Sequence, residues 1–169
     1  MRPEALNFIL CPHCAGELSL SNDASCPADD GHIMTGSLTC QSCASPFAIR
    51  NGVPILLPAN LASVKLETAS RFAEEWTRWS DLRGYYEQEF FDWVVAPLNA
   101  RDFADQIVFE GGCGKGRHTA IVASHGATAI VSLDLGESAF VAELHANFQI
   151  CVLSALRPRE GNSYNQSEQ

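Results

Sequence analysis

The sequence predicts an α/β chain in which a small metal-stabilised β unit is followed by helices and then by an incomplete parallel sheet. Two C-x2-C pairs, Cys11–Cys14 and Cys40–Cys43, predict the β unit. A strand, a glycine-rich turn, a helix and a second strand follow one another over residues 106–134, which predicts the parallel sheet. The chain is 46% hydrophobic and only 18% charged, a composition that excludes a disordered polymer and a coiled coil.

Charge and hydropathy narrow the possible partners and compartments. The 169 residues carry a net charge of −9, which argues against a protein that binds a phosphate backbone through a basic face. No stretch approaches the roughly 20 apolar residues needed to span a bilayer, and the N-terminus has no signal pattern. We therefore expect a cytoplasmic protein without membrane contact, in which cysteines act as metal ligands or buried thiols rather than disulfides.

The paired cysteines predict a structural zinc site with the ligands Cys11, Cys14, Cys40 and Cys43. A C-x2-C turn aims two thiolates at one point, and two such turns supply the tetrahedral four-sulfur set that Zn²⁺ favours. The spacer between the pairs, residues 15–39, is longer than the roughly 15–20 residues usual for such sites. Four free buried thiols or a redox C-x-x-C pair are the alternatives. Cys26 and His32 lie within the spacer, where each is either a loop residue or a metal ligand in place of one of the four cysteines.

A β-hairpin follows the second pair, because Asn51-Gly52 separates two apolar runs and suits a turn with two positive φ angles. A cysteine turn that feeds a hairpin is a zinc ribbon. The C-x2-C pairs, the Gly36-x-Leu38-x-Cys40 lead-in and the hairpin from Phe47 to Leu56 resemble the small zinc-ribbon family that activates tRNA, rRNA and protein methyltransferases in eukaryotes. Similar bacterial modules are fused ahead of a methyltransferase domain.

The chain divides into a zinc-ribbon-like domain over residues 1–58, a helical connector or lid over 59–105, a partial nucleotide-binding domain over 106–156 and a disordered tail over 157–169. The connector is rich in aromatic residues, which serve either as core packing between helices or as a lid over a ligand. The aromatic positions are Phe72, Trp76, Trp79, Tyr85, Tyr86, Phe90, Phe91 and Trp93, with Gly84 as a candidate hinge.

The glycine-rich turn lies between two predicted strands. Residues 106–110 are expected to form a buried parallel strand, residues 118–124 a helix that stops at Gly126, and residues 129–134 a second strand that ends in an acid. This unit is half of a Rossmann-like fold. The loop fits neither G-x-G-x-x-G nor a P-loop, but reads Glu110-x-Gly112-x-Gly114-x-Gly116. Lys115, Arg117 and His118 are expected at the surface where the helix starts.

With Asp134 at the end of the next strand, this pattern resembles the first two motifs of class I S-adenosylmethionine-dependent methyltransferases. The resemblance implies that Gly112, Gly114 and Gly116 lie under the methionine part of S-adenosylmethionine and that Glu110 orders the loop and the amino group of the cofactor. Cys113, between these glycines, is either a further cofactor contact or a small loop residue. The resemblance also implies that Asp134 holds the ribose hydroxyls and that Leu135 lies against the adenine. An NAD-type site and a purely structural turn are the alternatives.

These resemblances imply an S-adenosylmethionine-dependent methyltransferase. The acidic composition favours an unidentified small-molecule acceptor, whereas the zinc-ribbon resemblance points toward RNA or translation factors; we expect the small molecule rather than RNA or protein. The catalytic residues are not identified. A full sheet of that family would need on the order of 100 further residues. We therefore expect a C-terminally truncated form that is not competent for transfer on its own and that self-associates through its open sheet edge. The alternative function is a zinc-ribbon module that binds proteins or activates a methyltransferase without catalysis.

Overall fold

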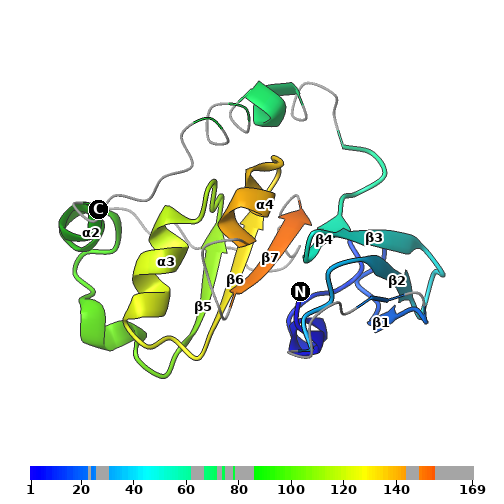
Figure 1. Cartoon of the computed structure of the whole chain (residues 1–169), viewed down its shortest axis with the longest axis horizontal. Helices are drawn as coiled ribbons and strands as arrows, with labels where there is room; N and C mark the ends of the chain where they lie inside the picture. The colour runs from blue at the N-terminus through cyan, green and yellow to red at the C-terminus, as the bar shows by residue number, and fades with distance from the viewer. Residues whose placement is uncertain are drawn as a thin grey trace, which may run out of the picture.

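The chain forms one mixed sheet, in which the strands of the N-terminal half are antiparallel and those of the C-terminal half are parallel (Figure 1). The computed structural model describes residues 1–22, 24–25, 31–61, 67–71, 74, 78, 86–143 and 149–154. The strand order is β1-β2-β3-β4-β7-β6-β5. The predicted α/β class is confirmed.

The N-terminal half is an antiparallel ribbon. A 3-10 turn, η1 (Pro3–Asn7), leads into β1 (Leu18–Leu20), β2 (Gly36–Cys40), β3 (Pro46–Arg50) and β4 (Val53–Leu56). Each strand pairs with the next, and Arg50 faces Val53 across the last turn. The predicted hairpin is confirmed, because Asn51 and Gly52 have φ angles of 47° and 80°.

The C-terminal half alternates strands and helices. It contains β5 (Ile107–Gly111), α3 (Arg117–Ser124), β6 (Ala129–Asp134), α4 (Ser138–Glu143) and β7 (Gln149–Ser154). β6 pairs in parallel with β5 on one side and with β7 on the other. The predicted strand–helix–strand unit is thus present, and β7 adds a third parallel strand beside β6.

The two halves join where β4 pairs in parallel with β7, through Ile55 opposite Leu153 and Leu56 opposite Ser154. One buried apolar cluster extends across the join. It contains Leu38 and Phe47 of the ribbon together with Val131 and Leu133 of β6. The ribbon therefore contributes both backbone hydrogen bonds and apolar packing to the parallel strands.

β5 differs from its prediction as a buried parallel strand. Ile107 and Phe109 are 60% and 59% exposed, while the alternate residue Val108 packs against α3. The prediction of a buried strand is wrong for the face that carries Ile107 and Phe109. β5 is the last strand of the sheet, and the described residues leave this face open. Apolar sequence alone does not reveal which strand lies at an edge.

The aromatic connector is partly core and partly surface. α2 (Tyr86–Glu89) continues into a π-helical turn, η2 (Phe90–Val94), and a 3-10 turn, η3 (Ala100–Phe103), follows. Phe90 is buried and packs on Phe103 with ring centroids 5.9 Å apart, whereas Trp93 is 85% exposed. Core packing is confirmed for Phe90 and is wrong for Trp93.

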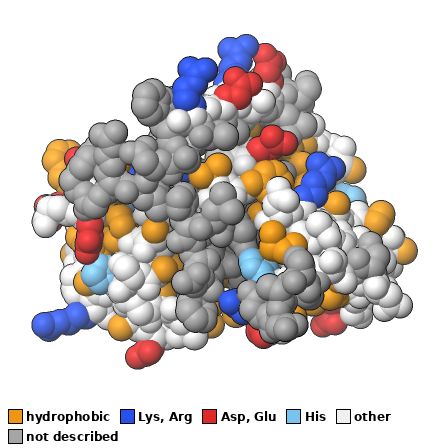
Figure 2. All heavy atoms as spheres, viewed as in Figure 1, with side chains coloured by type: hydrophobic (Ala, Val, Ile, Leu, Met, Phe, Trp, Pro, Cys, Tyr) orange, Lys and Arg blue, Asp and Glu red, His pale blue; other side chains and the backbone are white. Residues whose placement is uncertain are grey.

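Several predicted features lie outside the described residues. They are Cys26, Phe72, Trp76, Trp79, Gly84, Tyr85 and the tail over residues 157–169. None of the described helices is long and apolar enough to cross a bilayer. On the face in view in Figure 2, described Lys and Arg side chains are scattered among Asp and Glu and form no continuous basic patch there.

Candidate functional site

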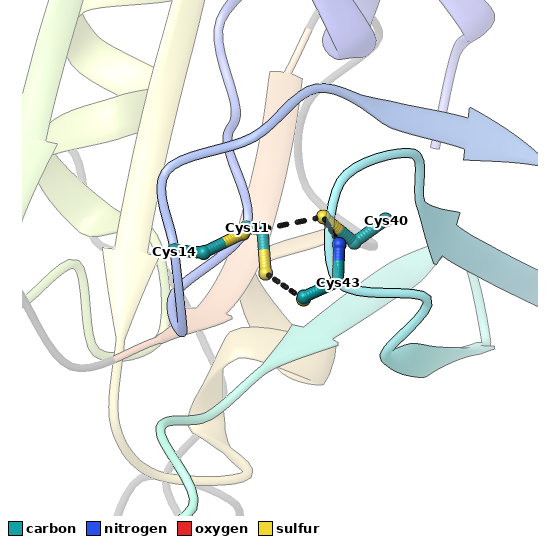
Figure 3. A group of neighbouring side chains, drawn as sticks. All are labelled: Cys11, Cys14, Cys40 and Cys43. Carbon is teal, nitrogen blue, oxygen red and sulfur yellow. Dashed lines mark hydrogen bonds between the residues drawn. The ribbon is translucent and has the colours of Figure 1, made fainter.

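Four cysteine sulfurs converge between two turns of the ribbon (Figure 3). The Sγ atoms of Cys11, Cys14, Cys40 and Cys43 all lie within 4.8 Å of one another. Cys11 and Cys43 are 3.6 Å apart, and Cys14 and Cys40 are 3.5 Å apart, measured between Sγ atoms. A tetrahedron with Zn–S bonds of about 2.3 Å has S···S edges of about 3.8 Å, so the cluster has the size of a zinc site.

The two turns that carry these sulfurs have the same backbone conformation. The N–H of Ala15 donates to the Cys11 carbonyl at 2.8 Å, and that of Ala44 donates to the Cys40 carbonyl at 3.0 Å. Both alanines have positive φ angles, 59° and 57°. Equivalent turns aim the cysteine pairs at one point from two directions, as tetrahedral coordination requires.

Backbone donors within the turns face the sulfurs. The N–H of His13 donates to Cys11 Sγ at 3.4 Å, and the N–H of Cys43 donates to Cys40 Sγ at 3.5 Å. Such donors stabilise negative sulfur, which is the form that binds a metal. Cys11 and Cys40 are buried whereas Cys14 and Cys43 are exposed, so the cluster lies at the surface of the ribbon.

Three thiols of the cluster, those of Cys11, Cys14 and Cys43, have shifted pKa values. Hydrogen bonds with the Ser45 hydroxyl and backbone lower the pKa of Cys43 to about 6. At Cys14 a hydrogen bond with the Gly16 backbone lowers the pKa, but the sulfurs of Cys43 and Cys40 outweigh it and raise the pKa to about 12. Burial raises the pKa of Cys11. Adjacent thiolates oppose one another's ionisation, and a divalent cation among them would offset this repulsion.

Among the described residues no further side chain joins this cluster, so His32 does not substitute for one of the four cysteines as a ligand. Four protein ligands complete the coordination of Zn²⁺ and leave no position for substrate. The donor set therefore fits a structural zinc, as the cysteine spacing predicts.

Comparison with known proteins assigns this part of the chain. Residues 2–52 match the family model described as Trm112p-like protein. The N-terminal segment is a Trm112p-like zinc ribbon. A "UPF0434 protein" of Azotobacter vinelandii is 28% identical to the chain over 67 residues, which are 40% of this chain and 92% of that relative. The match to the Trm112p-like model ends at residue 52, so the methyltransferase reading of residues 106–156 stays a prediction.

A second candidate site lies beyond the Trm112p-like ribbon, at the carboxyl ends of β5 and β6. A pocket of about 250 Å³ opens there, which is slightly smaller than the roughly 300–1,000 Å³ typical of small-molecule sites. Its described lining comprises Ala69, Gly112, Cys113, Gly114, Lys115, Arg117, His118, Asp134 and Ser138. Four of the seven residues predicted to contact S-adenosylmethionine line this pocket: Gly112, Cys113, Gly114 and Asp134.

Asp134 organises the loop around this pocket. Its Oδ2 accepts the N–H of Gly114 at 2.7 Å, and its Oδ1 accepts the N–H of Gly136 at 2.7 Å and the Ser138 hydroxyl at 3.3 Å. A carboxylate has about four acceptor positions, so these three bonds leave about one for a ligand hydroxyl. The pair of ribose hydroxyls expected from the resemblance would therefore have to share that position or displace a bond.

Glu110, at the end of β5, is not among the described residues that line the pocket. Its Oε2 accepts hydrogen bonds from the hydroxyls of Thr119 and Ser132, the latter at 3.3 Å, and its Oε1 lies 3.9 Å from His118 Nδ1. Burial raises the pKa of Glu110, and the negative charge of Asp134 raises it further. The hydrogen bonds from Thr119 and Ser132 act in the opposite direction and lower this pKa. This arrangement suits the predicted role of ordering the loop.

Two other predicted contacts, Gly116 and Leu135, are likewise absent from the pocket lining. A Cβ on Gly116 would lie 2.9 Å from Cα of Ala142 in α4. Gly116 therefore permits close packing between the start of α3 and α4, which is a structural role.

Lys115 was expected at the surface, and that expectation is wrong. The side chain is only 8% exposed and lines the pocket. Ser138 was also missed, although its position four residues after Asp134, at the start of a helix, is a recognisable signal.

Proposed function

We propose that the chain is a zinc-ribbon protein-interaction module of the methyltransferase-activating type, and not a self-sufficient enzyme. The match of residues 2–52 to the Trm112p-like model supports this function, since the ribbon family that the sequence resembles activates methyltransferases. The match also favours a protein partner over the small-molecule acceptor expected from the acidic composition.

The observation that carries the proposal is the way the ribbon contacts a parallel sheet. β4 adds to the sheet beside β7, and the ribbon core includes Val131 and Leu133 of β6. A ribbon that extends a parallel sheet and covers its apolar face is suited to stabilise an α/β domain of the methyltransferase type. In this chain the ribbon acts on the α/β unit of its own polypeptide, and the β5 edge, which no described strand covers, is available to a partner protein.

Capture and stimulation of a methyltransferase test this function. The zinc-loaded full chain is immobilised and exposed to an extract of its own cells, and the retained proteins are assayed for methyl transfer with and without added chain. We expect retention of a methyltransferase whose rate rises on addition of the chain. Cys40→Ala, which removes a zinc ligand, should abolish both effects, while Cys113→Ala, a buried cysteine outside the cluster, should preserve them. An unchanged rate of methyl transfer would contradict the proposal.

A second candidate function is S-adenosylmethionine binding at the glycine loop, and the pocket bounded by Gly112, Gly114 and Asp134 favours it. These residues would hold the methionine and ribose parts of the molecule, which supplies an activated methyl group when bound. Isothermal titration of the full chain with S-adenosylmethionine is the direct test. We expect micromolar binding that weakens in Asp134→Ala, and a flat titration with the wild-type chain would exclude this function.

A further inference from the structure

His13 lies in the first cysteine turn but is not part of the four-sulfur donor set. Its ring reaches the second turn, where Nδ1 is 3.0 Å from the hydroxyl oxygen of Ser45. The same hydroxyl oxygen is 3.2 Å from Sγ of Cys43. A continuous chain of hydrogen bonds therefore runs from the imidazole through one serine to a sulfur of the cluster, and it joins two turns that are distant in sequence.

The imidazole is held in this place by an aromatic contact and by the backbone of its own turn. Its ring centroid lies 5.3 Å from that of Phe47, with the two ring planes tilted by 59°. Phe47 belongs to the buried core of the ribbon, so it gives the imidazole a fixed surface to pack on. The backbone N–H of His13 donates to Cys11 Sγ at 3.4 Å. His13 thus contacts one sulfur through its main chain and reaches a second, that of Cys43, through Ser45.

Cys43 is one of the two cysteines of the cluster that are exposed, whereas Cys11 and Cys40 are buried. An exposed sulfur ligand is open to exchange with water and to attack by oxidants and electrophiles. A hydrogen bond from a protein donor withdraws charge from the sulfur and fixes the orientation of the side chain. Ser45 and His13 therefore lie where they can compensate for the exposure of this ligand.

The direction of each hydrogen bond follows from the metal-bound state. A cysteine sulfur that binds zinc has lost its proton and can only accept, so the Ser45 hydroxyl must donate to Cys43. A hydroxyl has one proton, so its oxygen must then accept from the ring of His13. Nδ1 of His13 therefore carries a proton, and a neutral ring has none on Nε2. The tautomer of His13 thus reports whether the chain of hydrogen bonds is formed.

We propose that Ser45 and His13 are positioning residues of the zinc site, which donate a chain of hydrogen bonds to the exposed ligand Cys43 and keep it on the metal. The inference rests on the structural zinc of the ribbon and adds two residues behind its four ligands. It depends neither on a methyltransferase partner nor on the glycine loop. Loss of either side chain should make zinc easier to remove while leaving all four cysteines in place.

Competition for zinc between the full chain and a chelator measures the effect. Ser45→Ala removes the hydroxyl, and His13→Phe keeps a ring against Phe47 but removes the donor. Each variant should bind zinc about tenfold more weakly, a typical cost of losing a partner behind a metal ligand. Ser45→Thr and His13→Asn return a hydroxyl and an N–H to the same places and should recover most of the affinity. Ser42→Ala removes an exposed hydroxyl of the same turn, outside this chain of bonds, and should change nothing.

Two spectroscopic measurements separate positioning of the ligand from a general effect on the fold. In the cobalt-loaded chain, the sulfur-to-metal charge-transfer band should move to longer wavelength in Ser45→Ala and His13→Phe, because a sulfur without its donor releases electron density more easily. NMR of the imidazole nitrogens in the zinc-loaded wild type, in weakly alkaline solution where imidazole is neutral, should show His13 protonated at Nδ1. If one variant does not fold, as judged by circular dichroism, the other provides the same test.

The outcomes separate this inference from the zinc site itself. Equal zinc affinities in the wild type, Ser45→Ala and His13→Phe would overturn it, as would a His13 ring protonated at Nε2 alone. Weaker zinc binding without a shift of the charge-transfer band would also overturn it, since the two side chains would then act only on the fold. These results leave the proposed methyltransferase activation intact, because that function requires only the four ligands. A wild-type chain that binds no zinc would overturn the structural zinc together with this inference.

Discussion

The carboxylate of Asp134 accepts the backbone N–H of Gly114 at 2.7 Å, so the end of β6 holds the loop that follows β5. Gly114 follows β5 and Asp134 ends β6, and these strands are parallel neighbours whose carboxyl ends lie at one edge of the sheet. The same carboxylate binds the N–H of Gly136 and so shapes the turn into α4. One side chain thus positions both segments of backbone that border the pocket.

Asp134→Ala should lower the free energy of unfolding by about 2–4 kcal/mol, because two backbone N–H groups and a hydroxyl lose a charged acceptor. Urea denaturation measures the loss. Asp102→Ala is a matched control, because Asp102 is an exposed carboxylate that accepts the backbone N–H of Asn99 and caps η3. That cap should contribute only about 1 kcal/mol. Equal losses in the two variants would show that Asp134 does not organise the loop.

The zinc cluster gives a prediction that can be read from both metal content and stability. We expect one zinc per chain by mass spectrometry of the native protein. Its removal by a chelator should lower Tm by at least about 10 °C, since a structural zinc contributes on the order of 10 kcal/mol. Cys40→Ala should lose the metal, whereas Cys113→Ala should retain it. A chain that melts at the same temperature with and without chelator would contradict a structural role.

Local sequence patterns were sufficient to predict the ribbon and the glycine loop. The C-x2-C turns and Asn51-Gly52 are short-range signals whose geometry depends on neighbouring residues alone. The parallel pairing of β4 with β7 has no such signal, because Ile55 and Leu153 meet only through the folding of the chain between them. For the same reason the exposure of Phe109 and the burial of Lys115 escaped prediction. Both depend on the position of a segment in the sheet or loop and not on residue type.

Gly116 is expected to tolerate substitution much less well than Gly112, although both have similar φ angles of 81° and 76°. An added Cβ at Gly116 would clash with Ala142, while one at Gly112 would meet nothing within 4 Å. Gly112→Ala should therefore cost only the backbone strain of about 1–2 kcal/mol. Gly116→Ala should cost about 1–3 kcal/mol more, from overpacking. Thermal denaturation of the two variants side by side checks the difference, and equal losses would argue against close packing of α3 on α4.

Glu110 gives the fold a pH dependence of known sign. Its pKa is raised in the folded state by burial, so between its unfolded and folded pKa values the native chain binds more protons than the unfolded chain. Stability should therefore fall as pH rises through this window, above about 4.5. Glu110→Gln removes this component, and the difference in unfolding free energy between variant and wild type should grow in favour of the variant from pH 4 to pH 7. His118, whose lowered pKa acts with the opposite sign, is present in both proteins. A difference that does not change with pH would show that Glu110 titrates normally.

The exposed edge of the sheet predicts self-association through β5. Ile107 and Phe109 present apolar surface beside the open backbone of the last strand, an arrangement that favours pairing with another chain. Size-exclusion chromatography over a hundredfold range of concentration should show a shift toward a larger species at high concentration. Phe109→Lys should keep the chain monomeric, because a charged side chain on an edge strand opposes pairing. Trp93→Lys provides the control, since Trp93 is more exposed but lies on η2 and not on a strand. If both variants remain associated, the contact lies elsewhere on the surface; if both become monomeric, it depends on general apolar exposure and not on the strand edge.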